Sequence, residues 1–292
     1  MPLFNSINQL ITKAESEHKS IADIMIEQEV EVTGLTVLDV MNGMEKNLAT
    51  MENAAAEGIE GVVSTTGLTG MDAQKMQRYI ESGRGLSGEL NLYAIAYAVS
   101  TNEVNAAMGQ ICATPTAGSA GVVPGVLFAM KQKNPNITRE EMLKFLFTAG
   151  AFGLVVANNA SISGAAGGCQ AEVGSASAMA AAALVELSGG TPEMCAHAFA
   201  IALKNMLGLV CDPVAGLVEV PCVKRNAAGA SNALTAADMA LSGIESRIPA
   251  DEVVEAMYKI GLTMPSSLRE TGRGGLAATP TGERLKQELF GN

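Results

Sequence analysis

Three cysteines in the second half of the chain have side chains that could hold a metal centre. Cys169 follows the glycine-rich run Gly164–Gly168, and Cys211 and Cys222 bound a segment that contains two prolines. Glycine and proline turns let the backbone bend around a bulky ligand. Thiolates are the ligands of iron–sulfur clusters, and three of them would leave one iron open to act as a Lewis acid. Their spacing matches no ferredoxin pattern, so buried structural thiols are the alternative.

The remaining cysteines, Cys112 and Cys195, are weaker candidates. On the helix expected from Thr191 to about Leu207, Cys195 shares an apolar face with Phe199, so it fits the core better than a metal site. The five cysteines form an odd set without a compact disulfide framework, and the chain begins without a basic segment followed by an apolar run. We therefore expect no signal peptide, free thiols and a reducing cytoplasm.

Two loops rich in glycine and hydroxyl groups could bind a small anion such as a carboxylate. Their candidate binding positions are Ser64, Thr65, Thr66 and Gly67 in the first loop, and Thr116, Gly118 and Ser119 in the second. Glycines let such loops expose backbone N–H groups, and the hydroxyls add further donors. The second loop is not a Walker loop, because no Gly-Lys-Ser/Thr follows it. A plain turn is the alternative reading of the first loop.

Two basic residues are candidates for contact with a substrate. Arg273 stands between glycines, where its guanidinium could reach a carboxylate without hindrance, although an exposed turn explains it equally well. Lys204 and His197 lie on the helix face opposite Cys195, so both could be at the surface or in a site. A desolvated lysine can work near neutral pH, and Lys204 is our candidate for the base or for a neighbour of the substrate ammonium group.

The composition excludes several kinds of partner. The 292-residue chain has a net charge of −11, which disfavours nucleic acid and anionic membranes because both attract basic surfaces. Two uncharged runs, Val104–Met130 and Phe145–Ala171, are long enough to span a bilayer. They contain prolines or asparagines and have no flanking basic or aromatic pattern. We expect them to be buried segments of a core, with no membrane contact.

The elements that position these residues are expected to be helices. Suitable N-cap residues are Ser6, Ser20, Thr138 and Thr191. The chain has 31 glycines and only 4% aromatic residues, so helices can pack closely, and no period-two strand pattern occurs. We predict an all-α fold: one compact domain over residues 1–292, with buried helices rich in small residues and glycine-rich loops at the active site. Residues 1–57 would supply amphipathic helices to that domain.

Several longer motifs extend over nearly the whole chain. They are Met25-Ile-Glu-Gln-Glu29, Cys112-Ala-Thr-Pro-Thr-Ala-Gly-Ser-Ala-Gly121, Gly167-Gly-Cys-Gln-Ala-Glu-Val-Gly-Ser-Ala-Ser177, Cys211-Asp-Pro-Val-Ala-Gly-Leu-Val-Glu-Val-Pro-Cys222, Lys224-Arg-Asn-Ala-Ala228 and Thr271-Gly-Arg-Gly-Gly275. Together they resemble the α subunit of the bacterial iron–sulfur L-serine dehydratases, also called L-serine deaminases. These motifs are long and specific to that family.

The resemblance implies an all-helical catalytic chain that holds a [4Fe–4S] cluster through Cys169, Cys211 and Cys222, with Cys112 nearby but not a ligand. It implies a lyase of amino-acid degradation and gluconeogenesis that converts L-serine into pyruvate and ammonia without net redox chemistry. The open iron would stabilise the leaving hydroxyl while a base removes the α-proton. A separate β subunit would complete a cytoplasmic heterodimer. Some relatives end in a cysteine that caps the iron; this chain ends Leu289-Phe-Gly-Asn292, so we do not expect thiolate capping.

Other functions stay open at this point. A pyridoxal-phosphate enzyme is disfavoured, because no lysine lies between Lys144 and Lys204, where the central glycine-rich motifs stand. A cysteine desulfidase-like lyase would use the same open iron, and a non-catalytic iron–sulfur scaffold or sensor would use the same thiols. The residues do not determine which group is the base, and a β subunit could itself supply it. They also do not determine whether the chain is active without a β subunit, or whether serine, cysteine or threonine is preferred.

Overall fold

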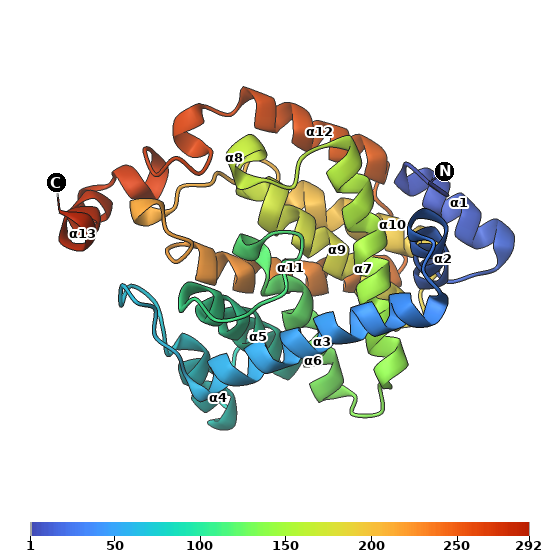
Figure 1. Ribbon diagram of the computed structural model, residues 1–292, viewed down its shortest axis with the longest axis horizontal. Helices are drawn as coiled ribbons and strands as arrows, with labels where there is room; N and C mark the ends of the chain where they lie inside the picture. The colour runs from blue at the N-terminus through green and yellow to red at the C-terminus, as the bar shows by residue number, and fades with distance from the viewer. Residues whose placement is uncertain (1, 292) are drawn as a thin grey trace.

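The computed structural model describes residues 2–291, which are predominantly helical (Figure 1). The α-helices are α1 (Ile7–Glu17), α2 (Ile21–Thr33), α3 (Val37–Glu60), α4 (Asp72–Glu81), α5 (Glu89–Ala106), α6 (Val122–Lys133), α7 (Arg139–Asn159), α8 (Gly164–Gly167), α9 (Ser175–Leu187), α10 (Pro192–Asn205), α11 (Cys222–Leu241), α12 (Ala250–Thr263) and α13 (Pro280–Phe290). The short segments are the 3₁₀ turns η1 (Ala117–Ser119), η3 (Val214–Gly216), η4 (Ser266–Leu268) and η5 (Gly275–Ala278), and the π-helical turn η2 (Gln170–Gly174).

Extended pairing is confined, within residues 2–291, to two isolated β-bridges. One joins Val63 to Gly70, and the other joins Cys211 to Arg269. The predicted all-α fold is therefore confirmed. The prediction of one domain over residues 1–292 includes Met1 and Asn292, which lie outside the described residues, and it stays a prediction.

Hydroxyl side chains start the helices where the sequence predicts them. Ser6, Ser20 and Thr191 each accept a hydrogen bond from a backbone N–H in the first turn of α1, α2 and α10. Thr138 forms a capping box with Glu141 at the start of α7. The third helix, α3, begins at Val37 because Thr36 forms a capping box with Asp39.

Small residues allow the central helices to pack at short distance. α9 lies among α6, α7, α10 and α11, and all of its residues from Ser175 to Val185 are buried. α5 and α6 also pack closely: a Cβ on Gly121, the N-cap of α6, would stand 2.2 Å from the Ala98 carbonyl oxygen. Only glycine permits that approach, so the contact with α5 fixes where the loop before α6 ends.

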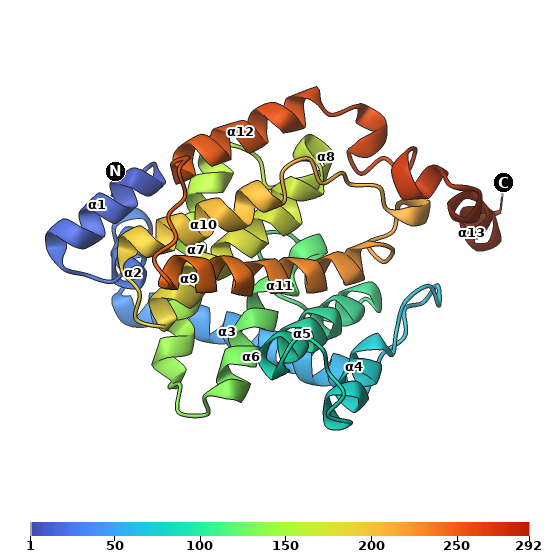
Figure 2. The same ribbon diagram turned by 180° about the vertical axis from the view of Figure 1, so that it is seen from behind.

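The two termini lie at opposite ends of the molecule, as both views show (Figures 1 and 2). α1 and α2 pack at one end, where α1 contacts α10 and α12. The segment between α10 and α11, residues 206–221, lies toward the other end, and its turn η3 contacts α13. α10 therefore connects two separate regions of the surface.

The two uncharged runs do not form continuous helices. Val104–Met130 contains the end of α5, the turn η1 and most of α6, and Phe145–Ala171 continues from α7 through α8 into η2. Among the described residues, none of the helices combines the length and the apolar character that crossing a lipid bilayer requires.

Candidate metal centre

Cys169 is held at the junction between α8 and η2. Gly168 precedes it with φ 78°, and a Cβ there would stand 2.6 Å from Met264 Sδ and 2.9 Å from the Leu209 carbonyl oxygen. Gln170 donates its backbone N–H to that Leu209 carbonyl (2.9 Å) and accepts from Gly208 N–H through its side chain (2.9 Å). The glycine and the glutamine thus hold Cys169 against the segment that leads to Cys211.

Cys211 lies on a short extended segment that pairs with the chain after α12. Its N–H donates to the Leu268 carbonyl (2.9 Å), and its carbonyl accepts from Glu270 N–H (2.8 Å). Cys222 is the first residue of α11, where the N–H groups of the first turn lack helical partners and favour negative charge. Segments far apart in sequence therefore converge on three thiols.

All three thiols are buried and influence one another's ionisation. A hydrogen bond between the Cys169 and Cys211 thiols lowers the pKa of Cys169 and raises the pKa of Cys211 above its usual range. Burial raises the pKa of Cys222 to about 12, and the charge of Cys169 contributes to that rise. These interactions place the three thiols in one electrostatic unit, in which Cys169 is the most readily deprotonated member.

Glu172 lies three residues beyond Cys169, in the turn η2, and its carboxylate meets the Cys211 thiol. Thr116 Oγ1 donates to its Oε1 (2.8 Å), and Cys211 Sγ donates to its Oε2 (3.8 Å). Burial raises the pKa of this carboxyl. The ligand atoms of Glu172, Cys211 and Glu270 lie within 4.8 Å of one another, which is a spacing that a metal ion can bridge.

The loop with Ser64, Thr65, Thr66 and Gly67 meets the segment between Cys211 and Cys222. Thr66 Oγ1 donates to both oxygens of the buried Glu219 (2.9 and 2.8 Å) and lies 3.1 Å from Ser64 Oγ. Ser64 is buried, whereas Thr65 and Gly67 are exposed. The structure thus brings this loop to the cysteine segment, with Thr66 engaged by a carboxylate.

The second predicted loop is closer to the thiols. A Cβ on Gly118 would stand 3.2 Å from Glu172 Oε1, and Thr116 bonds the same carboxylate directly. Ser119 is fully buried and donates to the Thr114 carbonyl (3.0 Å), so its hydroxyl shapes the loop. Cys112 lines a cavity of about 170 Å³ together with its neighbours Thr114 and Pro115.

The two basic candidates are not brought into contact with the thiols. Lys204 is exposed at the end of α10, and within residues 2–291 its side chain forms no hydrogen bond or ion pair. Arg273 is exposed as well, with the same lack of partners in the described chain. The backbone of the Arg273 loop nevertheless packs against the turn η3, because a Cβ on Gly272 would stand 3.2 Å from Gly216 N.

Arg225 and Asp212 form a largely buried ion pair beside the thiols. Arg225 Nη2 lies 2.8 Å from Asp212 Oδ1, and Arg225 Nη1 donates to the Val210 carbonyl (2.8 Å). The positive charge of Arg225 also lowers the pKa of Cys169, although the hydrogen bond from Cys211 lowers it more. The pair therefore connects α11 to the Cys211 segment.

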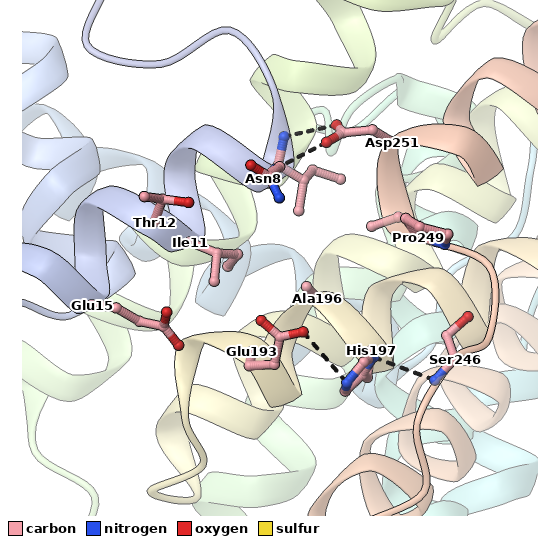
Figure 3. Close-up of a pocket in the computed structure, with 12 residues that line it drawn as sticks. Asn8, Ile11, Thr12, Glu15, Glu193, Ala196, His197, Ser246, Pro249 and Asp251 are labelled. Atoms are coloured by element: carbon pink, nitrogen blue, oxygen red, sulfur yellow. Dashed lines mark hydrogen bonds and ion pairs between the residues drawn. The ribbon is translucent and has the colours of Figure 1, made fainter.

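A different cavity, of about 310 Å³, lies at the opposite end of α10 (Figure 3). His197 points into it between Glu193 and Ser246, with Nδ1 accepting from Ser246 N–H (3.3 Å) and Nε2 3.6 Å from Glu193 Oε1. Cys195, from the same part of α10, is fully buried in the core, as predicted. His197 therefore belongs to a region separate from the three thiols.

Sequence reasoning missed four residues of this centre: Glu172, Asp212, Glu219 and Arg225. Glu172 stands three positions after Cys169, a spacing that puts two side chains on one face of a helical turn. Asp212 directly follows Cys211 and Glu219 stands three positions before Cys222, so both could have been found as acidic neighbours of the candidate ligands. Arg225 follows Cys222 at the same helical spacing.

Comparisons with known proteins identify the family of this chain. The family described as "Serine dehydratase alpha chain" matches residues 16–277. The chain is 69% identical to the probable L-serine dehydratase, alpha chain, of Bacillus subtilis (strain 168), over 99% of this chain and 96% of that one. It is 42% identical to the L-serine dehydratase, alpha chain, of Peptoniphilus asaccharolyticus, over 99% of both chains.

A longer relative contains the same region as part of one chain. L-serine dehydratase 2 of Escherichia coli (strain K12) is 37% identical over 89% of this chain, which corresponds to 61% of its own length. The match to the family extends over most of the present chain, and the similarity to its named members is high. The chain belongs to the serine dehydratase alpha chain family.

Proposed function

We propose that this chain is the catalytic α chain of an L-serine dehydratase, a carbon–oxygen lyase that converts L-serine into pyruvate and ammonia. The names of its relatives support the reaction. The observation that carries the site is the convergence of Cys169, Cys211 and Cys222 with the Glu172 carboxylate in one buried region.

The residues of this region fit a [4Fe–4S] cluster as the cofactor. The three thiols are buried soft donors from separate segments, and a Cβ on Gly164 would stand 3.1 Å from Cys211 Sγ, so a side chain there would intrude on the thiol. Cys169, Cys211 and Cys222 would hold the cluster through thiolates. When bound, it would supply a Lewis acid that stabilises the hydroxyl group leaving from serine.

The protein groups around the thiols would bind and orient the substrate. Thr116 and the N–H groups near Gly118 lie beside Glu172, so this loop is the better placed candidate for the substrate carboxylate. The Ser64–Gly67 loop and Arg273 remain candidates for the outer part of the site, since the Ser64 loop reaches Glu219. Ser119 would act by holding the shape of its loop.

Two groups of this chain are candidates for the base that removes the α-proton. Lys204 is the candidate from the sequence, but its side chain is exposed at the end of α10. Glu172 is supported by its position, because its Oε2 faces the Cys211 thiol and its Oε1 is fixed by Thr116. A carboxylate oriented in this way can hold the proton at Oε2.

We further propose that the protein partner of this chain is a β chain. The words "alpha chain" in the names of the relatives support a second subunit, and the greater length of the Escherichia coli relative supports a fused arrangement elsewhere in the family. We infer a cytoplasmic heterodimer, in keeping with the free thiols.

The proposal is tested by anaerobic reconstitution with iron and sulfide, followed by a serine-to-pyruvate assay with and without a co-expressed β chain. We expect a broad brown absorption and pyruvate formation that is lost on exposure to oxygen. A sharp yellow band with full activity in iron-free protein would instead identify pyridoxal phosphate. Iron binding without turnover of serine or cysteine, in the presence of the β chain, would identify a scaffold or sensor, and release of sulfide from cysteine in preference to ammonia from serine would identify a desulfidase.

A further inference from the structure

Arg225 lies among the segments that supply the three thiols. It stands one turn after Cys222 on α11, and its positive charge acts on both the Cys169 and the Cys222 thiols. Its Nη1 donates to the carbonyl of Val210, the residue directly before Cys211 (2.8 Å). This single side chain therefore joins α11 to the Cys211 segment and places a positive charge near Cys169.

Asp212 holds the Arg225 guanidinium in place. The Asp212 carboxylate is almost completely buried, pairs with Arg225 through Oδ1 (2.8 Å) and accepts Leu276 N–H through Oδ2 (2.7 Å). Gly275 makes the last contact possible: its φ is 59°, and a Cβ there would stand 2.3 Å from Asp212 Oδ2. The glycine-rich tail motif thus has a physical role, since it lets the backbone after α12 clamp Asp212.

The charge balance of the region gives Arg225 a further role. Three thiolates in a buried site repel one another, and the nearby Glu172 and Glu270 add negative charge. An arginine is always protonated, so it places a permanent positive charge among them. Groups of this kind, which orient and balance metal ligands without touching the metal, commonly change metal affinity 10- to 100-fold, roughly, when removed.

We propose that Arg225, held by Asp212 and the Gly275 turn, is a positioning residue that keeps the three thiol segments together and retains the cluster. This inference rests on the proposed function, because it requires the cluster to be the cofactor. It assigns a role to the motif Lys224–Ala228, which the proposed reaction does not otherwise use, and to Gly275 in the motif Thr271–Gly275.

The test is the rate of iron release from anaerobically reconstituted protein, measured with an excess of chelator as the loss of the visible absorption. Iron and sulfide per chain and the Tm of the iron-free protein are measured alongside. We expect Arg225→Met to release iron about tenfold faster or more. Because this variant leaves Asp212 buried and unpaired, the double variant with Asp212→Asn is examined too; it removes both charges and keeps the acceptor for Leu276 N–H.

Lys224→Met is the matched control, since it removes the same charge from the neighbouring residue of α11. Lys224 is largely exposed and pairs with Asp72, away from the thiols, so this variant should release iron at the wild-type rate. The inference is overturned if the folded double variant keeps iron as wild type does, if Lys224→Met loses iron equally fast, or if neither Arg225 variant folds. If the wild-type chain takes up no iron, the cofactor of the proposed function fails and this inference fails with it.

Discussion

The two ends of α10 differ in the kind of polar group they gather. Near its first turns, the cavity beside His197 holds carboxylates that are used by the fold: Asp251 accepts the N–H groups of Ile7 and Asn8 (2.8 and 2.9 Å) and so caps α1 (Figure 3). Beyond its last turn, the carboxylate of Glu172 and three thiols are buried together. Both ends are polar, but only the second gathers soft ligands in a buried region.

This difference shows that the presence of a cavity is not enough to identify an active site. The His197 cavity satisfies helix ends, which is a structural requirement of any helical protein. At the thiol end, burial raises the pKa of Glu172 and Cys222. Groups with perturbed ionisation and no structural need to be buried mark a functional site.

The largest expected effect separates the ligand thiols from a buried thiol that only packs. Cys211→Ala should abolish cluster binding and reduce pyruvate formation to background, because one of three ligands is lost. Cys195→Ala changes the thiol that only packs in the core, so this variant should keep the full iron content. Its free energy of unfolding should fall by about 1 kcal/mol. Iron analysis and thermal unfolding measure both. Wild-type iron content in Cys211→Ala would remove this cysteine from the ligand set.

A smaller effect, on kcat, is expected when one carboxylate is changed at each end of α10, Glu172 at the thiols and Glu193 beside His197. Glu172→Gln should lower kcat about 10²- to 10⁴-fold if its oxygen accepts the α-proton, whereas Glu193→Gln in the His197 cavity should leave kcat unchanged. The assay uses the reconstituted α chain with its β chain. Lys204→Met is measured in parallel: loss of kcat in that variant with full activity in Glu172→Gln would assign the base to Lys204.

Asp251→Ala tests the structural role of the cavity beside His197, at the start of α10. Two N–H groups at the start of α1 lose their acceptor, so we expect a loss of about 1–2 kcal/mol in the free energy of unfolding. Iron content and kcat should not change, since α1 is remote from the thiols. A fall in iron content with little change in stability would show that the two ends of α10 are coupled.

The smallest effect is a change in pH dependence. Glu186 accepts Ile21 N–H (2.7 Å) at the start of α2, and burial raises its pKa above the ordinary 4.5. The native state therefore holds this proton more tightly than the unfolded chain, so its contribution to stability is full below pH 4.5 and declines as the pH rises through the raised pKa. Glu186→Gln should flatten this decline in denaturant titrations of iron-free protein. An unchanged slope would show that Glu186 does not titrate in this range.

The sequence alone predicted the all-α fold, which the structure confirms, and it supplied the candidate ligands, which stay a prediction. Caps at Ser6, Ser20, Thr138 and Thr191 act over a few residues, so local rules predict them well. The cysteines were selected with the help of long motifs that resemble a family, since their spacing is uninformative by itself. Cys195 was assigned to the core because helical periodicity alone put it on an apolar face.

Only the tertiary structure decided which polar residues surround the thiols. Lys204 and Arg273 fitted the expected chemistry, yet both side chains are exposed, whereas Glu172 and Asp212 are buried and Arg225 is largely buried. The physical reason is that the contacts of Glu172 with Thr116 and of Asp212 with Leu276 join residues 56 and 64 positions apart. Loop closure over such lengths depends on the packing of the whole chain. Local sequence determines where a helix starts, but the folded core determines which loops meet at its end.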